Sequence, residues 1–497
     1  MVGDTTPMDL QSGFRLRRTH EKSRRGCLRC KHQRKKCDEL RPSCSRCTKR
    51  AYPCRYQGVS EQESPRPAIS PGVVGSASNT SSSSGQPALR YNTEESFISS
   101  QNGTLDATEL SLLAHYLTHT SQTIPFDHLD LYALSVGVPN LAFNCNFVMA
   151  SLLALAAACK CHDIAKQAPS PLDHQTVSSI KELLALAERH HTASLRHVQA
   201  AMQNSGSYDS VLATAALMVL YASASHSIRV HLAATAKDCG RRLPSEVLPQ
   251  HSQWISFTRA AHTASTAVLK DMVDQDQECT ATTPDVDTRI PGAVLSPQDG
   301  PSESTKKLFL PLVESTYRRA LESLRRRGES TVSSCDSIQL HASLATISVL
   351  EKCASAALST DSNRVEPPNQ PRLFTESSNV TPWVARYMIS VTSMESPQAL
   401  RRIIMSFLNK APAEYLSLVQ SVLDAPSEEE CLDATNFLAM DIFAHWLVLV
   451  MLLDGVWWIG DIGQWELGQV VAFMKSRTGE RWWPGSMYLV KRELHLQ

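Results

Sequence analysis

The sequence predicts a small cysteine-rich module followed by a large all-α domain. Six of the 14 cysteines fall between residues 27 and 54, and the other eight are spread through the rest of the chain. From Leu105 onward, apolar residues recur at helical spacing, and the alternation typical of strands is scarce. With 497 residues, the chain is long enough for two or three domains, including one with a large core.

Charge divides the chain in the same way. Lys and Arg total 49, as do Asp and Glu, so the formal net charge is zero. Residues 1–58 nevertheless hold 16 Lys or Arg against five Asp or Glu, a net charge of +11, which leaves −11 for the remainder. A compact basic head on an acidic body indicates that the head alone binds a polyanion.

The setting of the cysteines favours metal over disulfides. Residues Met1–Gln11 are polar and lack the apolar core of a secretory signal. The longest apolar stretch, Ile442–Leu453, is interrupted by His445 and is too short to span a bilayer, so no membrane partner is predicted. In a reducing compartment, crowded cysteines are typical of metal ligands rather than of disulfides.

Composition divides the chain into four segments. Residues 1–26 form a basic N-terminal arm, and residues 27–56 form the cysteine module. Residues 57–104 are rich in Ser, Pro, Gly and Asn and cannot bury enough apolar surface to order themselves, which predicts a disordered linker. Residues 105–497 form the all-α domain. No heptad repeat follows the cysteines, so no coiled-coil dimerisation helix is predicted there.

The first helix of the all-α domain has a clear start signal. Asp106 and Glu109 are spaced as an N-cap and capping-box pair, and leucines then recur on one face. Residues 147–161 are apolar nearly all round, as in a helix buried in a large core. Further helices are predicted over 178–203, 210–222, 257–273, 306–327, 338–358 and 433–453, with polar insertions at about 275–304 and 359–380.

The six clustered cysteines repeat the spacing C-x2-C-x6-C. They are Cys27, Cys30, Cys37, Cys44, Cys47 and Cys54. Zinc takes four ligands in a tetrahedron, with Zn–S bonds of roughly 2.3 Å. Six thiolates satisfy two zinc ions only if two sulfurs bridge both metals, and the internal repeat makes Cys27 and Cys44 the natural bridges. Few apolar side chains occur in the module, so the two zinc ions must supply most of its folding free energy.

The run RRGCLRCKHQRKKCDELRPSCSRCTKRAYPCRY resembles the fungal Zn2Cys6 (zinc binuclear cluster) family of transcription factors. The resemblance covers residues 24–56 and includes the cysteine spacing, the basic run after the second cysteine, Asp38 and Pro42. It implies that the helix opened by the second cysteine enters the major groove of DNA. It also implies that Gln33 and Arg34 reach the bases.

The resemblance separates base contacts from phosphate contacts. Arg34 can pair with guanine through two hydrogen bonds, in keeping with the CGG-type half-sites of this family, whereas Gln33 departs from the usual Lys or Arg and can pair with adenine. Phosphate contacts position the domain without specifying a sequence. They are predicted for Arg29, Lys31, Lys35, Lys36, Arg46, Lys49 and Arg50. Basic clusters at Arg15–Arg18 and Arg24–Lys36 also predict import into the nucleus.

Both ends of the all-α domain resemble the regulatory domain of fungal sterol uptake control proteins and their filamentous-fungal relatives. The segments ELSLLAHYLTHTSQTI, PNLAFNCNFVMASLLALAA, LLDGVWWIGDIGQWELG and RWWPGSMYLV carry this resemblance. It implies either sterol binding or activation of secondary-metabolite genes. The cluster Trp446, Trp457, Trp458 and Trp465 fits plain core better than a pocket for a small lipophilic ligand. The segment Cys159–His162 fits core thiols and a surface histidine better than a metal site.

These observations predict a fold class, a small Zn2Cys6 binuclear-cluster domain plus a large all-α regulatory domain, and a function. No Gly-rich phosphate loop, H-E-x-x-H or G-x-S-x-G motif occurs, so no enzymatic activity is predicted. The predicted function is sequence-specific transcription regulation of the RNA polymerase II type in the nucleus, by activation of a fungal secondary-metabolite gene cluster. The predicted partners are double-stranded DNA and the transcription machinery, and any homodimer would form through the helical domain. The alternatives are a sterol-responsive regulator of lipid genes and a zinc-dependent protein-interaction module that does not bind DNA.

We predict that residues 1–103 bind a single half-site as a monomer. Residues 57–103 supply a tether without heptads, and a flexible chain of that length has a root-mean-square span of roughly 35–40 Å. Such a tether sets no fixed distance between two half-sites. Sedimentation of the 1–103 fragment measures its oligomeric state, and a tight dimer would contradict the prediction. Its DNA affinity should fall with salt at a logarithmic slope of about −0.9 per phosphate contact.

Overall fold

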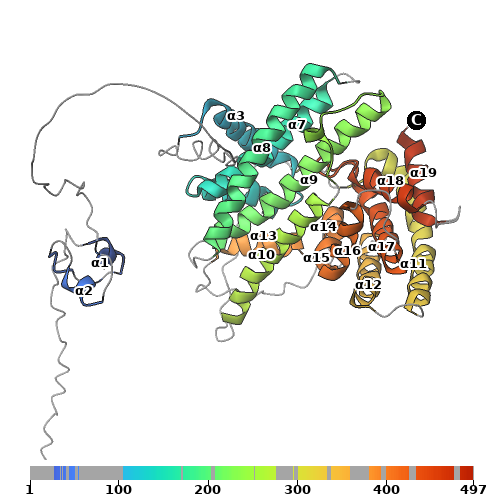
Figure 1. The fold of residues 1–497 in the computed structure, drawn as a ribbon. Coiled ribbons are helices and arrows are strands. Elements are labelled where there is room, and N and C mark those ends of the chain that lie inside the picture. The colour runs from blue at the N-terminus through green and yellow to red at the C-terminus, as the bar shows by residue number, and fades with distance from the viewer. Residues whose placement is uncertain are drawn as a thin grey trace, which may run out of the picture. The chain divides into compact units, whose positions relative to one another are not determined.

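The computed structural model divides into two units, Met1–Thr93 and Glu94–Gln497 (Figure 1). In the first unit the described residues are 27–33, 35, 37–40, 44–50 and 54. In the second they are 104–168, 172–202, 208–250, 252–275, 295, 300–332, 337–358, 380–392, 399–424, 433–474 and 482–495. The predicted arm over 1–26 and nearly all of the predicted linker over 57–104 lie outside the described residues.

Two short helices provide the regular structure described in the first unit. α1 (Leu28–His32) begins directly after Cys27, and α2 (Ser45–Thr48) begins directly after Cys44. The two cysteines occupy equivalent positions before their helices, with φ angles of −59° and −67°. The repeated C-x2-C-x6-C spacing therefore appears in three dimensions as a repeated turn-and-helix. The hydrophobic cluster described in this unit consists of cysteines.

All regular secondary structure described in the second unit is helical, which confirms the predicted all-α class. The elements are α3 (Ala107–His115), η1 (Tyr116–Thr120), α4 (Ser121–Thr123), α5 (His128–Tyr132), η2 (Ala133–Gly137), α6 (Val138–Ala142), α7 (Asn146–Gln167), α8 (His174–Ala201), α9 (Tyr208–Asp238), η3 (Ser245–Val247), α10 (Gln253–Gln275), η4 (Thr305–Phe309), α11 (Leu310–Val332), α12 (Ile338–Leu358), α13 (Pro382–Thr392), α14 (Leu400–Met405), α15 (Phe407–Lys410), α16 (Ala413–Asp424), α17 (Ala434–Val450), η5 (Met451–Leu453), α18 (Ile462–Met474) and α19 (Trp483–His495).

Aspartate side chains determine where several of these helices begin. The predicted capping box of α3 is present: Asp106 accepts the backbone N–H of Glu109 at 2.8 Å, and Glu109 accepts the N–H of Asp106 at 2.9 Å. Asp127, Asp173 and Asp433 cap α5, α8 and α17, each with its carboxylate accepting the backbone N–H three residues further on. Each such cap satisfies a backbone donor that the helix leaves free, a contribution of about 1 kcal/mol.

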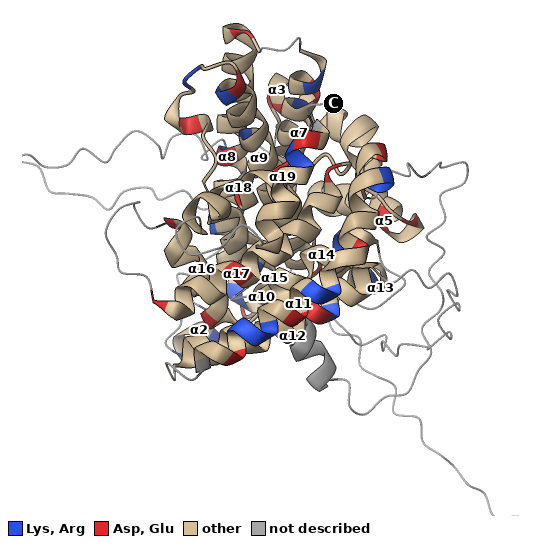
Figure 2. Ribbon diagram, turned by 90° about the vertical axis from the view of Figure 1, so that its right-hand side faces the viewer, with Lys and Arg blue, Asp and Glu red and all other residues tan. Residues whose placement is uncertain are grey.

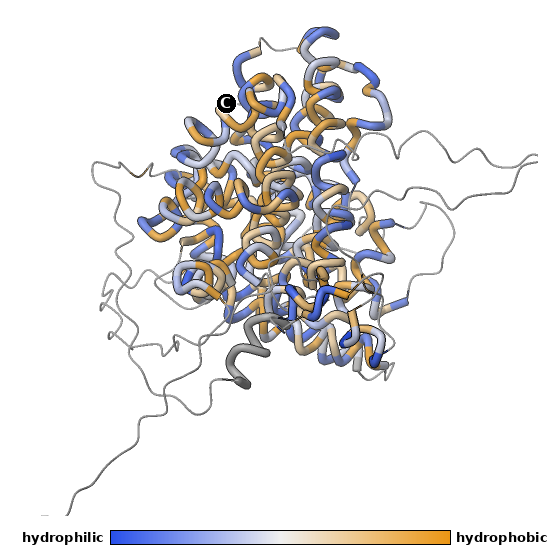
Figure 3. The backbone as a smooth tube through the Cα atoms, turned by 90° about the vertical axis from the view of Figure 1, so that its left-hand side faces the viewer, coloured by the Kyte–Doolittle hydropathy of each residue, from blue (hydrophilic) through white to orange (hydrophobic). Residues whose placement is uncertain are grey.

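Three apolar helices, α7, α9 and α17, run through the core of the second unit. By length and composition alone, α7, α9 and the segment Ala434–Leu453 could each cross a membrane, but 61%, 89% and 89% of their most apolar windows are buried within the fold. The apolar segment around His445 thus runs from Ala434 to Leu453, which is longer than the predicted stretch Ile442–Leu453. Helices that are apolar on all sides occur in large cores as well as in membranes. Figure 3 shows hydrophobic segments in the helices that pass through the middle of the unit.

Trp446 lies at the centre of this core. Its ring stacks on Trp254 of α10, with 6.1 Å between ring centroids, and on Phe407 of α15, with 5.2 Å between them. Its Nε1 donates to the carbonyl of Ile404 at 2.9 Å. Three helices that are far apart in sequence thus meet at one fully buried indole, which supports the core interpretation of this tryptophan.

Buried ion pairs connect further distant segments. Asp130 of α5 hydrogen-bonds to Arg402 of α14, and Arg401 lies 3.6 Å from the same carboxylate. Lys491 of α19 pairs with Asp454 at 2.9 Å. Removing one partner of a buried pair leaves an uncompensated charge and typically costs about 3–5 kcal/mol. Figure 2 shows other charged residues of both signs distributed along helices such as α11 and α12.

The sequence predicts the long helices better than the short ones. α12 matches its predicted range, and α8 and α10 each begin four residues before theirs. α9 extends 16 residues beyond its predicted end because small and polar residues such as Ser225 and His226 are buried in its second half. Helices α5, α6, α13 to α16, α18 and α19 are not among those predicted from the sequence. The two predicted polar insertions lie mostly outside the described residues.

We predict that Gly463→Ala destabilises the protein more than Gly468→Ala, although both glycines lie in α18. A Cβ atom at Gly463 would come within 2.6 Å of the backbone nitrogen of Met451, whereas at Gly468 the nearest atoms belong to the side chain of Tyr488, at 3.1 Å. Backbone cannot move aside, so Gly463→Ala should lower the free energy of unfolding by about 1–3 kcal/mol. At Gly468 the side chain of Tyr488 must shift slightly, which costs stability, but alanine favours the helix over glycine by about 1 kcal/mol. The two effects oppose each other, so Gly468→Ala should be near neutral. Urea unfolding of both variants measures the difference, and equal losses would contradict it.

Candidate functional site

The six cysteines predicted as metal ligands gather in one cluster of the first unit. Five of them are at most 4% exposed, and Cys54 is half-buried beside them. The Sγ atoms of Cys27 and Cys44 lie 3.7 Å apart, and the Cys27–Cys47 and Cys30–Cys44 distances are each 3.8 Å. Neighbouring sulfurs of a tetrahedral zinc site lie about 3.8 Å apart when the Zn–S bonds are about 2.3 Å. The sulfurs therefore have the spacing that zinc requires.

Contacts among the thiols divide the cluster into two overlapping groups of four. The groups are Cys27, Cys30, Cys37 and Cys44, and Cys27, Cys44, Cys47 and Cys54. Cys27 and Cys44 belong to both groups. This arrangement fits the predicted sharing of these two sulfurs by two metal ions.

The crowded thiols also require a positive charge between them. Burial, with a further contribution from the neighbouring thiols, raises the pKa of the Cys30 thiol well above its ordinary value and that of Cys47 to about 12. Thiolates held this close repel one another unless a cation lies between them. Two Zn²⁺ ions would reduce the charge of six thiolates from −6 to −2, so the cluster fits the metal chemically as well as by distance.

Backbone hydrogen bonds place the third cysteine of each half beside the first. The N–H of Cys27 donates to Sγ of Cys37 at 3.4 Å, and the N–H of Cys44 donates to Sγ of Cys54 at 3.3 Å. Both bonds span ten residues, so they are equivalent under the internal repeat. Donors aimed at sulfur stabilise its thiolate form, which is the form that binds metal.

Asp38 links the two halves of the module. Its carboxylate accepts the N–H of Ser45, the first residue of α2, at 3.0 Å. The hydrogen bonds with Ser45 lower the pKa of Asp38 from its ordinary value. The next residue, Glu39, has a φ of 58°, so the chain turns sharply at this point. From the sequence, Asp38 is recognised only as part of the family pattern, whereas in the structure its carboxylate lies at the N-terminus of α2.

The residues predicted to contact DNA lie on and after the two short helices. Gln33 directly follows the last residue of α1, and its side chain is exposed. Among the predicted phosphate contacts, Lys31, Lys35, Lys49 and Arg50 are exposed, whereas Arg29 and Arg46 are half-buried. Arg34 and Lys36 lie outside the described residues. The exposed cations thus extend outward from the helix ends, while the cysteines face inward.

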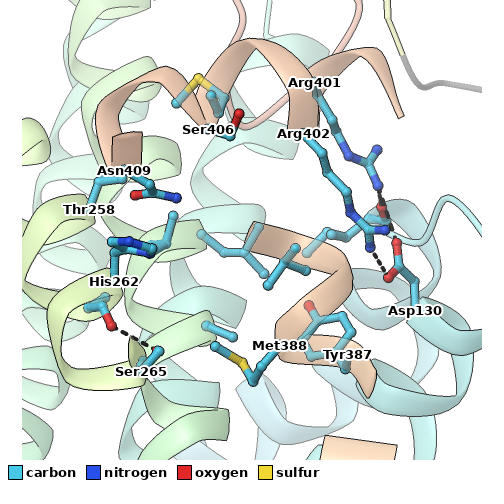
Figure 4. Close-up of a pocket in the computed structure, with 18 of the residues that line it drawn as sticks. Asp130, Thr258, His262, Ser265, Tyr387, Met388, Arg401, Arg402, Ser406 and Asn409 are labelled. Atoms are coloured by element: carbon cyan, nitrogen blue, oxygen red, sulfur yellow. Dashed lines mark hydrogen bonds and ion pairs between the residues drawn. The ribbon is translucent and has the colours of Figure 1, made fainter. Parts of the chain in front are cut away.

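The second unit contains a cavity bounded by α9, α10, α13 and α14 (Figure 4). Arg401 and Arg402 point toward Asp130 at one side of it, and His262 and Asn409 lie at the other side. Burial, together with the nearby cations, lowers the pKa of His262 to about 4. The cavity volume is about 110 Å³, whereas pockets for drug-sized ligands typically measure about 300–1,000 Å³. As it stands, the cavity holds only a small group.

The predicted tryptophan cluster divides between core and cavity. Trp446 is fully buried in the core, and Trp458 lines the cavity. Trp457 packs against His162, with ring centroids 5.2 Å apart. Cys159 and Cys161 are core thiols with at most 1% exposure, as predicted, whereas His162 is half-buried rather than a surface residue. A wider hollow of about 680 Å³ lies at the start of α8 and the end of α9.

Comparison with protein families matches both units. Residues 25–63 match the fungal Zn(2)-Cys(6) binuclear cluster domain, and residues 111–266 match the fungal specific transcription factor domain. The first match contains all six clustered cysteines. The binuclear cluster domain binds two zinc ions, and the sulfur distances in this chain fit zinc ligation.

Individual relatives agree with these matches. The chain is 32% identical over 143 residues to the Zn(2)-C6 fungal-type transcription factor afumD of Aspergillus fumigatus, which covers 28% of this chain and 33% of that protein. It is 52% identical over 40 residues to a Zn(2)-C6 fungal-type transcription factor of Gibberella zeae, or 8% of each chain. It is 55% identical over 40 residues to sterol uptake control protein 2 of Candida albicans, which covers 8% of this chain and 6% of that protein.

These findings define a class of protein with a zinc-cluster module and an all-α domain. Residues 25–63 and 111–266 of this chain are similar to the binuclear cluster domain and the transcription factor domain of fungal proteins. The chain spans about a third of the length of the Aspergillus relative and less than a tenth of the other two.

We predict that bridging and non-bridging cysteines differ in how many zinc ions they hold. In a fragment of residues 20–60, Cys44→Ser should abolish binding of both ions, because each group of four then lacks one sulfur. Cys54→Ser should leave one group of four intact and retain one ion. Native mass spectrometry counts the ions in each variant. A single zinc in the unsubstituted fragment, or equal losses in the two variants, would exclude the shared-sulfur arrangement.

Proposed function

We propose that this protein is a sequence-specific DNA-binding transcription regulator of the RNA polymerase II type that acts in the nucleus. The observation that carries this proposal is the cluster of six sulfurs at zinc-site distances, with exposed cations on the helices around it. The matching families consist of transcription factors, so we propose regulation rather than catalysis. The net charge of +11 on residues 1–58 supplies the attraction to the phosphate backbone.

In this proposal the six cysteines hold two zinc ions, and the metal cluster orients α1 toward DNA. The six cysteines alone form too small a hydrophobic core to stabilise the fold of the module. Metal binding and folding of the module are therefore coupled. Gln33 and Arg34 read base edges in the major groove, and the other basic side chains bind phosphates. The sites read are CGG-type half-sites, and any homodimer forms through the helical domain.

We assign the protein to a fungal secondary-metabolite gene cluster as a pathway-specific activator that recruits the transcription machinery. One observation weighs against the sterol-responsive alternative. The 143-residue match to the Aspergillus transcription factor is much longer than the cysteine module, whereas the two sterol uptake control proteins match over only 40 and 43 residues.

Two experiments separate the alternatives. Sterol that copurifies with residues 105–497 would favour the sterol-responsive regulator. A randomised-site selection that recovers no preferred sequence would favour the protein-interaction module without DNA binding. Genomic occupancy measured together with transcript changes in a deletion strain identifies the target genes and the direction of regulation.

We predict that Arg34→Ala and Lys49→Ala weaken DNA binding in different ways. Arg34 occupies the base-reading position, so its loss should lower discrimination between bases by about 1–3 kcal/mol. Lys49 is exposed at the end of α2, so its loss should weaken binding evenly across sequences and reduce the salt slope by about 1. Both variants are compared in a randomised-site selection and in salt titrations. An equal change of the selected motif would reject this division of roles.

A further inference from the structure

Four side chains of the second unit bring metal-binding atoms together, outside the zinc cluster and the cavity. They are His115, His119, Cys159 and Asp163, and their ligand atoms all lie within 4.8 Å of one another. The Nε2 atoms of both histidines lie 3.2 Å from the same oxygen, Oδ2 of Asp163. Two imidazoles, a thiol and a carboxylate suit zinc, whereas calcium and magnesium prefer oxygen ligands alone.

The four residues form two pairs, each with a spacing of four residues. His115 ends α3 and His119 lies in η1, while Cys159 and Asp163 both lie in α7. Side chains four residues apart lie on the same face of a helix. α3 and η1 both pack against α7, so the H-x3-H pair of one segment faces the C-x3-D pair of the other. η1 is a π-helical turn, a feature found frequently at functional sites.

Other polar groups orient these ligands. Nδ1 of His115 lies 3.1 Å from the hydroxyl of Thr120, and Thr120 also hydrogen-bonds to the sulfur of Cys159. Nδ1 of His162 lies 3.5 Å from Oδ1 of Asp163, the oxygen that the other histidines do not contact. Metal-binding imidazoles and carboxylates typically have such second partners, which fix their orientation. Here these partners leave Nε2, Sγ and Oδ2 turned toward one another.

The group lies at the edge of the core, where an ion can enter. Cys159 is 1% exposed, whereas the side chains of His115, Asp163 and His119 are 20%, 24% and 47% exposed. Although His119 is the most exposed of the four, its Nε2 points at Asp163. A thiolate and a carboxylate would balance the two charges of Zn²⁺, so the loaded site would carry no net charge in its half-buried position.

We propose that these four side chains hold a third zinc ion, in the helical domain and independent of the cysteine module. Zn–ligand bonds of about 2.0–2.3 Å place ligand atoms roughly 3.3–3.8 Å apart, so the widest pairs close by about 1 Å on binding. The Cys159 thiol releases its proton to solvent as its sulfur binds the ion. The bound ion then joins the first helical segment of the domain to α7, which stabilises the start of the domain.

The experiment counts zinc ions in the full-length chain. The unsubstituted protein, loaded with zinc and freed of weakly bound metal, should hold three ions by native mass spectrometry. His119→Ala and Cys159→Ser should each hold two. The matched control is His197→Ala, which removes an exposed histidine of α8 and should still hold three. Circular dichroism of each variant verifies that the helices persist. His119 has the most exposed side chain of the four ligands, so His119→Ala removes a ligand with little change to the core.

A substitution in the cysteine module allows the ion of the helical domain to be counted without the two ions of the module. The result then does not depend on the proposed function of the module. Cys44→Ser should remove the two ions of the module and leave one, and adding His119→Ala should remove the last. In the Cys44→Ser background, Co²⁺ should give a visible absorption band that Cys159→Ser abolishes. Two ions in the unsubstituted protein, or three in both His119→Ala and the His197→Ala control, would overturn the proposal.

Discussion

The sharing of two sulfurs by two metal ions is the constraint on which the N-terminal module depends. Six thiols cannot complete two tetrahedra unless two of them count twice, and the two groups of thiol contacts overlap at Cys27 and Cys44. Both shared cysteines also immediately precede a helix. Metal binding therefore sets the start of α1 and of α2 at the same time, and Asp38 adds a hydrogen bond from one half to the start of the other half's helix.

The helical domain is stabilised by different forces. Its centre is made of apolar helices and stacked aromatic rings, and buried ion pairs join segments as distant as Asp130 and Arg402. Burial of this extent is favourable at roughly 25 cal/mol per Å² of apolar surface, without any metal. The two units thus respond to different conditions. A chelator or low pH acts first on thiolate–metal bonds, whereas a denaturant acts on the apolar core.

The cysteine module could be predicted in detail because its information is local. All six cysteines lie within 28 residues, and the ligand spacing, the internal repeat and the charge requirement can all be taken from that segment. The all-α class and the long helices of the body could be predicted from apolar spacing, as for α12. The short helices α13 to α16 could not, because their positions depend on packing against α9, α10, α12 and α17 rather than on their own sequence.

The same distinction explains why the second group of metal-binding side chains was hard to recognise. The sequence draws attention to Cys159, Cys161 and His162, which are close together along the chain. On a helix, however, residues one or two positions apart point in different directions, whereas residues four apart share a face. Cys159 therefore lies beside Asp163, and Cys161 turns toward the carbonyl of Ile180 at 3.7 Å. The histidine pair that completes the group lies some 40 residues earlier in the sequence, in α3 and η1. The spacing of residues within either segment does not show that these helices pack against α7. In the sequence, such a site appears as two pairs of metal-binding residue types, each pair spaced i and i+4, on two separate helices. These pairs predict a metal site only when the two helices are known to pack against each other.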